Sequence, residues 1–457
     1  MMQELRSRLR LPTSRGLADA VSGAIRDQVL LEGDRLPPIR AVAKALNLSP
    51  TTVNAAWALL VRGGLLHTDG RRGTVVAIRT GALGKGGGAA DRSAGLTRYR
   101  QAVDRTSLFE LDLATGVPDP LLLPDLSAAL QQIPDRRTVN SYLDDAALPA
   151  LVEVLRHDWP YTAGRFAIVD GAMDAIQQIA SQLLRFGDKV VVEHPAFPPL
   201  LDLLESMGIA FVGVGLDGSG MLAAELAAAI TADVKVVFLQ PRAHNPTGIS
   251  YSAERITELA AILRRSAVIV VEDDSAGAIS SSPAVSIGSH LPEQTLHIRS
   301  FSKSHGPDLR LAAMSGPVDL VDRISERRRL GQGWTSRLLQ SVLLHLLVEP
   351  ESLAQVEHAR ATYARRREDL VQDLSGLGVQ VAARDGINLW LPVKDETAAL
   401  LRLAAARIGA AAGRPFSARP DEDAHLRVTC GLVASHHEEV AAELGAATRM
   451  WGWREAR

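Results

Sequence analysis

Apolar and polar positions repeat in two different ways along this chain. Between residues 14 and 61, apolar side chains recur every three or four positions, which is the spacing of one face of a helix. From about residue 166 onward, short apolar runs alternate with helical segments, an order typical of a mostly parallel sheet covered by helices. Residues 80–94 are rich in glycine and lack a period. The pattern predicts a small helical domain, a flexible tether and a large α/β domain.

The first domain is predicted to contain three helices. The first helix spans 14–31, and the second opens after Pro37 and Pro38. Ser49 is placed as the N-cap of the third helix, with Pro50 at its first position. This helix should stop at the glycines at 63 and 64, and the stripe that it should bury consists of Val53, Trp57, Leu60 and Val61. The second and third helices, joined by a tight turn, form a helix-turn-helix.

Two short strands, 65–68 and 74–77, should follow the third helix and form a hairpin, or wing, with Arg71 and Arg72 at its tip. The segment resembles the winged-helix domain of the GntR regulators. The resemblance rests on Leu36-Pro37-Pro38-Ile39-Arg40, Ser49-Pro50-Thr51-Thr52-Val53 and Gly70-Arg71-Arg72-Gly73-Thr74. Pro50 stands where the family usually has an arginine, which removes one contact to DNA.

The charge distribution also points to a nucleic-acid partner for the first domain. Residues 1–80 hold 12 Lys and Arg against 6 Asp and Glu, a net charge of +6. The remainder holds 38 against 46, a net charge of −8. A basic segment on an acidic body suggests a polyanionic partner. By resemblance and position, the residues expected to face double-stranded DNA are Arg40, Ser49, Thr51, Thr52, Asn54, Arg71 and Arg72.

In the large domain, reactive and polar residues follow the apolar runs. Parallel sheets place ligands at the carboxyl ends of their strands, so these residues are predicted to form one site. Lys303 comes just after an apolar run that ends near Arg299, and Ser300, Ser302 and Arg310 flank it. A lysine amine can form a Schiff base with an aldehyde, while hydroxyls and an arginine can bind a phosphate.

The stretch SFSKSHGPDLR, 300–310, resembles the pyridoxal-phosphate lysine motif of fold-type I aminotransferases. The resemblance implies pyridoxal 5'-phosphate on Lys303, Asn245 at the ring hydroxyl oxygen, Asp273 at the ring nitrogen and Phe197 stacked on the ring. Asp274 stays open as an alternative to its neighbour Asp273. The contacts expected around the phosphate are Gly171, Ala172 and Met173 at a helix start, with Ser300, Ser302 and Arg310.

Two later segments resemble the substrate side of the same family. His425–Thr429 places Arg427 at a substrate carboxylate, and Gly386–Trp390 places Asn388 near the substrate. Ser275 stands where the family usually has a tyrosine that touches the ring hydroxyl. Because serine is shorter and far less acidic, we expect the site to bind an amino compound but to complete transamination slowly, if at all. Whether the large domain is an enzyme stays open.

A GntR-like head joined to an aminotransferase-like domain is the arrangement of the MocR-type regulators, which the chain resembles. The resemblance implies a winged helix at 1–79, a flexible glycine-rich linker at 80–106, and at 107–457 a fold-type I domain that binds pyridoxal phosphate and dimerises. The expected function is a DNA-binding transcription regulator that senses the cofactor or an amino compound. Two alternatives remain: a working aminotransferase with a DNA-binding head, and a cofactor-free dimeric scaffold.

Composition and cysteine content indicate the cellular compartment. The chain is 46% hydrophobic and 22% charged, which is ordinary for a soluble protein, and no apolar run approaches the ~20 residues of a membrane helix. Its single cysteine, Cys430, excludes an internal disulfide and gives no metal cluster. The first ten residues lack the apolar core of a secretory signal. The expectation is a cytoplasmic protein without a metal or a membrane partner.

Overall fold

The computed structural model describes residues 2–9, 11–26, 29–31, 33–62, 66–69, 73–76, 98–103, 109–132, 145–419 and 423–451, which divide into two compact units. The N-terminal unit contains α1 (Met2–Arg8), α2 (Ser14–Arg26), α3 (Ile39–Leu46), α4 (Pro50–Arg62) and the strands β1 (Leu66–Asp69) and β2 (Gly73–Val76). The two strands pair antiparallel. The predicted helices and hairpin of a winged helix are thus confirmed, and α1 is an additional helix that the sequence pattern did not indicate.

Two details of the N-terminal unit differ from the prediction. The first predicted helix ends at Arg26 instead of continuing to residue 31, because the amides of Val29 and Leu30 both donate to the carbonyl of Ala24 and the chain turns there. This turn buries Leu30. Val61 was expected in the buried stripe of α4 but is 37% exposed. The stripe consists of Val53, Ala56, Trp57 and Leu60, so the alanine takes part instead.

Ser49 caps α4 as predicted. Its hydroxyl accepts a hydrogen bond from the amide of Thr52 at 2.9 Å and lies 2.8 Å from the Thr52 hydroxyl. Asn47, in the left-handed region with φ of 56°, closes α3 just before it. The turn of the helix-turn-helix is therefore fixed by one residue on each side of Leu48.

Replacing Ser49 with alanine should loosen the start of α4. The loss of an N-cap costs about 1 kcal/mol, which corresponds to roughly fivefold faster opening of the first helical turn. Hydrogen exchange of the α4 amides in the full chain measures this, with the exposed Thr51→Ala as the control. Equal protection in Ser49→Ala and wild type would show that the cap contributes nothing.

The larger unit is built on an eight-stranded sheet with the order β4-β11-β10-β9-β8-β5-β6-β7. Its central pairs, β8 with β9 and β9 with β10, are parallel, while β11 runs antiparallel to β10 and β4. The strands are β4 (Arg165–Val169), β5 (Lys189–His194), β6 (Ala210–Asp217), β7 (Gly220–Met221), β8 (Val234–Leu239), β9 (Ile269–Asp274), β10 (Thr295–Ser300) and β11 (Ala312–Gly316). The mostly parallel sheet predicted from the alternating pattern is confirmed.

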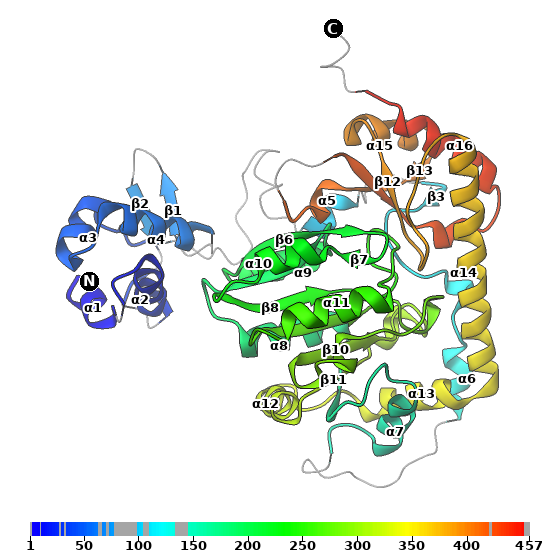
Figure 1. Ribbon diagram of the computed structural model, residues 1–457, viewed down its shortest axis with the longest axis horizontal. Coiled ribbons are helices and arrows are strands. Elements are labelled where there is room, and N and C mark those ends of the chain that lie inside the picture. Colours follow the sequence, from blue (N-terminus) through cyan, green and yellow to red (C-terminus); the bar gives the residue numbers. More distant parts are fainter. Residues whose placement is uncertain are drawn as a thin grey trace. The chain divides into compact units, whose positions relative to one another are not determined.

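Helices cover this sheet and link it to a smaller one (Figure 1). They are α6 (Leu126–Gln131), α7 (Pro149–His157), α8 (Ala172–Leu183), α9 (Pro198–Ser206), α10 (Ala223–Ala229), α11 (Ala253–Leu263), α12 (Val318–Arg329) and α13 (Arg337–Val348). The long helix α14 (Pro350–Gly376) packs against α13 at one end and against α16 (His437–Thr448) at the other. It therefore joins the large sheet to the C-terminal subdomain.

The C-terminal subdomain holds a three-stranded sheet, β12-β15-β14, and a separate two-stranded pair, β13-β3. Its elements are β3 (Leu111–Asp112), β12 (Leu389–Pro392), β13 (Ile408–Gly409), β14 (Ala411–Ala412), β15 (His425–Val428) and the helix α15 (Glu396–Ala405). A further helix, α5 (Arg98–Ala102), lies inside the range predicted as linker. Ala102 and Val103 pack against Ala114 and Phe416, so this part of the range is helical and ordered on the larger unit.

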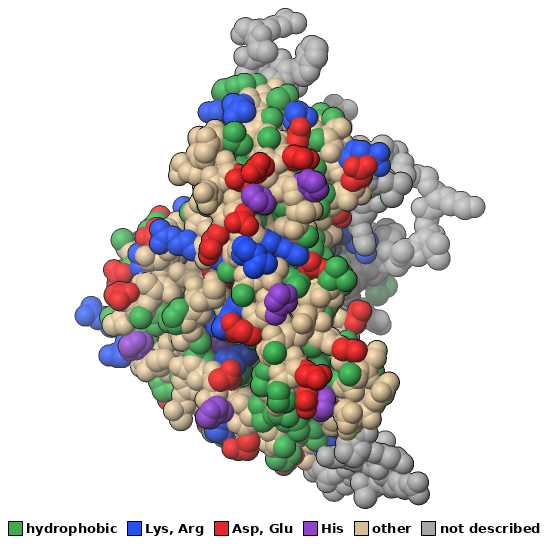
Figure 2. Space-filling model, turned by 90° about the vertical axis from the view of Figure 1, so that its right-hand side faces the viewer, with side chains coloured by type: hydrophobic (Ala, Val, Ile, Leu, Met, Phe, Trp, Pro, Cys, Tyr) green, Lys and Arg blue, Asp and Glu red, His purple; other side chains and the backbone are tan. Residues whose placement is uncertain are grey.

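None of the helices in the described ranges is long and apolar enough to cross a bilayer. Figure 2 shows the face of the larger unit that carries α14, with acidic, basic and apolar side chains interspersed over its described part. In residues 1–80, by contrast, basic residues outnumber acidic residues by six. The electrostatic attraction for a polyanion is therefore expected from the N-terminal unit.

Candidate functional site

The parallel strands β9 and β10 bring the predicted acid and lysine to the same edge of the large sheet. Asp273 lies opposite Ile298 in their register, and Lys303 follows three residues after the end of β10. The Lys303 ammonium donates a hydrogen bond to the carbonyl of Ser275 at 3.2 Å. Lys303 and Asp273 thus lie at the carboxyl ends of adjacent parallel strands, as the sequence predicted.

The structure distinguishes the two adjacent acids. Asp274 is 1% exposed and forms an ion pair with Arg242 at 2.5 Å, with Arg299 at 3.8 Å on the same side. Burial acts to raise the pKa of Asp274, but the charges of Arg242, His297 and Arg299 and the hydrogen bond from Arg242 together outweigh burial and hold that pKa below its usual value. Neighbouring strand residues point to opposite faces, so Asp273 faces away from these arginines. Asp273 is the better candidate for a ligand contact.

Within the described part of the chain, only one carboxylate oxygen of Asp273 accepts a hydrogen bond. Its Oδ2 accepts a hydrogen bond from the side-chain amide of Gln240 at 2.7 Å. Its Oδ1 is buried and has no hydrogen-bond partner among the described residues. A buried carboxylate oxygen without a partner costs free energy unless a ligand donor meets it. Sequence reasoning missed Gln240, although its place at the end of β8, five residues before Asn245, was a usable signal.

Asn245 lies between Gln240 and Arg427. Its backbone amide donates to the side-chain oxygen of Gln240 at 2.9 Å, and its own side-chain oxygen is 3.5 Å from a guanidinium nitrogen of Arg427. Arg427 is 1% exposed and also donates to the carbonyl of Ala114. A side chain at Gly116 would come within 2.6 Å of the same guanidinium. The Arg427 contacts therefore tie β15 to the segment after β3 beside Asn245.

Asn388 lies at the start of β12 and is 3% exposed. Its side-chain oxygen is buried without a hydrogen-bond partner among the described residues. Its backbone carbonyl lies close to Gly248, where a Cβ would come within 2.6 Å, so the glycine permits this close approach. The prediction that Asn388 contacts a substrate or effector stays a prediction.

The predicted phosphate contacts meet at the start of α8. Gly171 has φ of 100°, and a Cβ there would lie 3.0 Å from the Arg310 guanidinium. Arg310 is exposed and donates to the carbonyl of Asp170 at 3.3 Å. Backbone amides at a helix start attract anions, and an arginine beside them adds a fork of donors. Ala172 and Met173 form the first turn of this helix.

Ser300 and Ser302 flank the turn that carries Lys303. Ser300 is 5% exposed, and its hydroxyl accepts a hydrogen bond from the Ser302 amide at 3.3 Å. Phe197 is half-buried and lines a narrow cavity together with Asp273 and Gln240. The structure thus brings the predicted stacking residue and the predicted ring-nitrogen acid to one cavity.

Burial adjusts the proton affinity of both charged groups at this edge. It lowers the pKa of the Lys303 ammonium, and the negative charge of Asp273 opposes that shift. It raises the pKa of Asp273, against the hydrogen bond from Gln240 and the charge of Lys303. A lowered lysine pKa increases the fraction of neutral amine, which is the nucleophilic form. A neutral amine at Lys303 is the form that a Schiff base would require.

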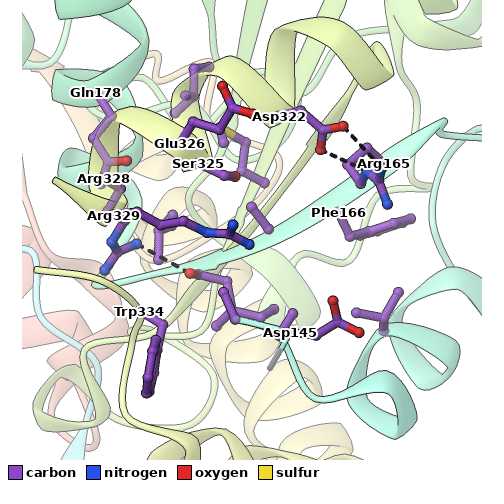
Figure 3. A pocket seen from close by; sticks show the side chains of 18 of the residues that line it. Asp145, Arg165, Phe166, Gln178, Asp322, Ser325, Glu326, Arg328, Arg329 and Trp334 are labelled. Atoms are coloured by element: carbon purple, nitrogen blue, oxygen red, sulfur yellow. Dashed lines mark hydrogen bonds and ion pairs between the residues drawn. The ribbon is translucent and has the colours of Figure 1, made fainter. Parts of the chain in front are cut away.

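A second hollow, drawn in Figure 3, lies beside β4 and α12. Arg165 forms an ion pair with Asp322 there at 2.9 Å, and Arg328 pairs with Asp170 at 2.6 Å. Its lining contains neither Lys303 nor Asp273. Because these charges are neutralised in pairs, this hollow is a weaker candidate for an anionic ligand than the edge at β9 and β10.

The N-terminal unit presents most of its predicted DNA-facing residues to solvent. Arg40, Ser49, Thr51 and Asn54 are exposed, and Thr52 is half-buried. The hydroxyl of Ser49 already accepts a hydrogen bond from the Thr52 amide as the N-cap of α4. Arg71 and Arg72 lie outside the described residues, so their contact with DNA stays a prediction.

Comparisons with known proteins agree with this two-part architecture. Residues 110–444 match the family described as aminotransferase class I and II, and residues 13–76 match the bacterial regulatory proteins of the gntR family. The chain belongs to the aminotransferase class I and II family, in the form fused to a gntR-type DNA-binding head that defines the MocR-type regulators. The predicted family and fold are thereby confirmed.

Individual relatives are similar to this chain over most of their length. The vitamin B6 salvage pathway transcriptional repressor PtsJ of Salmonella typhimurium is 34% identical over 386 residues, which cover 83% of this chain and 85% of PtsJ. The HTH-type transcriptional regulator TauR of Rhodobacter capsulatus is 29% identical, over 90% of this chain and 89% of TauR. The crystal structure of Pyrococcus horikoshii kynurenine aminotransferase has a TM-score of 0.68 at 21% identity, covering 80% of this chain and 96% of that chain, which shows the fold.

The residues at the strand edge fit the cofactor of this family, pyridoxal phosphate. The fit rests on the buried Asp273 oxygen, which has no hydrogen-bond partner among the described residues, on the amine of Lys303 in the turn after β10, and on the α8 start beside Arg310. These three features match the pyridinium nitrogen, the aldehyde and the phosphate of one molecule. A cofactor-free scaffold offers no reason for a buried acid with an unused oxygen.

Proposed function

We propose that this chain is a pyridoxal-phosphate-dependent transcription regulator. Its N-terminal unit binds double-stranded DNA, and its larger unit holds the cofactor on Lys303 and senses either the cofactor itself or a small amino compound. The observation that carries this proposal is the buried Oδ1 of Asp273 near Lys303, to which none of the described residues donates a hydrogen bond. The protein acts as a homodimer in the cytoplasm.

Each residue at the site has a proposed role. When bound, the cofactor supplies an aldehyde that condenses with amines and a ring that withdraws electrons. Asp273 would keep a proton on the ring nitrogen, the side-chain amide of Asn245 would bind the ring oxygen, and Phe197 would stack on the ring. Arg310, Ser300, Ser302 and the backbone amides of Gly171, Ala172 and Met173 would bind the phosphate. Arg427 and Asn388 would recognise an amino compound.

The relatives support a sensing role. PtsJ is named as the transcriptional repressor of the vitamin B6 salvage pathway, which fits a regulator that responds to this cofactor. A ligand shifts an equilibrium between two arrangements only by its difference in affinity for them, and a preference of ~1.4 kcal/mol gives about a tenfold shift. Regulation therefore requires binding and does not require turnover.

The test of this function is a titration of the purified protein with pyridoxal phosphate and then with a panel of amino compounds. Visible absorption reports the cofactor, and fluorescence anisotropy on labelled DNA from its own promoter region reports the head. The proposal predicts that at least one of these additions changes DNA affinity at constant salt. A protein that binds DNA identically under every addition would leave the regulatory proposal without support.

A working aminotransferase is the second candidate, because Lys303, Asp273 and Arg427 are all present near one another. Ser275 argues against fast turnover. Its hydroxyl is buried without a hydrogen-bond partner in the described part of the chain, and it lacks the reach and acidity of a phenol. Steady-state turnover in the range of about 1–10³ s⁻¹ would establish the enzyme and displace the sensor.

Ser275→Tyr should speed proton transfer in the larger unit. A phenol near the ring oxygen acts as an acid or base, and a positioned group of this kind contributes about 10²-fold or more. Single-turnover spectroscopy with amino donors measures the rate, and Ser275→Ala is the matched control that removes the hydroxyl without adding a phenol. Equal rates in all three proteins would show that Ser275 does not limit the chemistry.

A further inference from the structure

We infer that Gln240 is a positioning residue of the cofactor site, which fixes the direction and charge of Asp273 and ties it to Asn245. This inference deepens the proposed function and rests on it. Gln240 follows directly after β8 and is 6% exposed, so its amide is held in a fixed environment.

Three hydrogen bonds hold Gln240 in place. Its side-chain nitrogen donates to Oδ2 of Asp273 at 2.7 Å, and its side-chain oxygen accepts from the amide of Asn245 at 2.9 Å. Its own backbone amide donates to Glu193 at 2.9 Å. One side chain thus links the residue proposed for the ring nitrogen to the residue proposed for the ring oxygen.

The contacts determine which way the amide of Gln240 points. A backbone N–H is always a donor, so the group that faces the Asn245 amide must be the oxygen of Gln240. The nitrogen then faces Asp273 and donates to it. A hydrogen bond donated to a carboxylate stabilises the charged form, and this bond opposes the rise that burial imposes on the pKa of Asp273.

The same bond sets the direction of Asp273. With Oδ2 held by Gln240, the carboxylate has one orientation, in which Oδ1 remains buried without a partner among the described residues. Glu193, which accepts the hydrogen bond from the backbone amide of Gln240, also accepts a hydrogen bond from the hydroxyl of Tyr251 at 2.6 Å. The support therefore extends from Asp273 through Gln240 to a second buried acid and the core around it.

An uncharged amide suits this position better than a titratable side chain. It donates to Asp273 and accepts from Asn245 at every pH, so the charge of Asp273 is not altered by a neighbour that gains or loses a proton. When the cofactor is bound, Gln240 would thus help Asp273 to keep the ring nitrogen protonated over a wider pH range.

The first variant is Gln240→Leu, which has a similar volume and no polar atoms. It leaves Asp273 Oδ2 and the Asn245 amide without partners, and we expect pyridoxal phosphate to bind about tenfold to hundredfold more weakly. The ¹⁵N chemical shift of ring-labelled bound cofactor should move toward the unprotonated value. Gln294→Leu is the matched control, since Gln294 donates to the Ser266 carbonyl at the opposite end of β10.

The second variant, Gln240→Glu, gives a pH signature that mere loss of structure would not give. Asp273 and Glu193 raise the pKa of the introduced carboxyl because like charges disfavour its ionised form. Below that pKa, the carboxyl is protonated, donates to Asp273 and replaces the amide. Above it, two carboxylates face each other, so cofactor affinity relative to wild type should fall as the pH rises.

Full-length protein loaded with pyridoxal phosphate is used throughout, and each outcome decides one point. A wild-type protein that fails to bind pyridoxal phosphate overturns the proposed function itself. If wild type binds, an unchanged ¹⁵N shift in Gln240→Leu, or an affinity ratio for Gln240→Glu that does not vary with pH, overturns the positioning role. A shifted nitrogen signal in Gln240→Leu, absent in Gln294→Leu, together with the pH-dependent loss in Gln240→Glu, supports it.

Discussion

Lys303→Ala should abolish the covalent attachment of pyridoxal phosphate and with it the aldimine absorption band of the reconstituted protein. The wild-type protein, after incubation with the cofactor and borohydride reduction, should carry a phosphopyridoxyl group on the peptide that contains Lys303. The reason is the position of this amine, which lies beside Asp273 at the strand edge with a lowered pKa. Visible spectra and peptide mass spectrometry measure both effects, and the expected change is complete loss.

Lys235→Ala is the control for this experiment, because Lys235 is an exposed lysine on β8 of the same sheet. It should retain the visible band and the modified Lys303 peptide. A colourless wild-type protein in excess cofactor, or a phosphopyridoxyl group on another lysine only, would contradict the assignment of Lys303.

Replacing Arg71 and Arg72 together with alanine should weaken binding to all DNA sequences alike. Contacts to phosphate carry no sequence information, and each one lost reduces the dependence of log affinity on log salt by about one unit. For two arginines at the tip of a wing, we expect a slope smaller by about two and affinity lower by roughly tenfold at physiological salt. Titrations at several salt concentrations measure both quantities.

Arg264→Ala with Arg265→Ala is the matched control, since these too are adjacent in sequence but lie exposed at the end of α11 in the larger unit. This pair should leave the salt dependence unchanged. If both double variants lose the same affinity, only net charge matters and the wing is not an interface. If neither changes the slope, the wing makes no phosphate contact.

Local patterns predicted most of the fold because each element carries its own signals. The stripe positions 53, 57 and 60, the cap at Ser49 and the apolar runs ending near 273 and 300 all reflect residues close in sequence. The errors occur where a tertiary contact decides. The first predicted helix turns early to bury Leu30, and α5 packs on Phe416 from within the range read as linker.

The site was predictable in part for the same reason. Motifs place Lys303, Asn245 and Asp273 at strand ends, and parallel strands bring those ends together. The choice between Asp273 and Asp274 needed the buried partners of each side chain, Arg242 for one and Gln240 for the other. The place of Gln240 after β8 was a usable signal, but its role depends on three hydrogen bonds that only the structure shows, with Glu193 on β5, Asp273 on β9 and the backbone amide of Asn245.

The most direct test measures DNA affinity with and without pyridoxal phosphate, in wild type and in Lys303→Ala, at the same salt concentration. It reports whether cofactor binding in the larger unit affects DNA binding by the N-terminal unit. The account predicts that the cofactor changes the affinity of the wild-type protein for its operator and leaves that of Lys303→Ala unchanged. A wild-type affinity that does not respond to the cofactor or to amino compounds, while the cofactor is covalently bound at Lys303, would contradict a regulator that senses through this site.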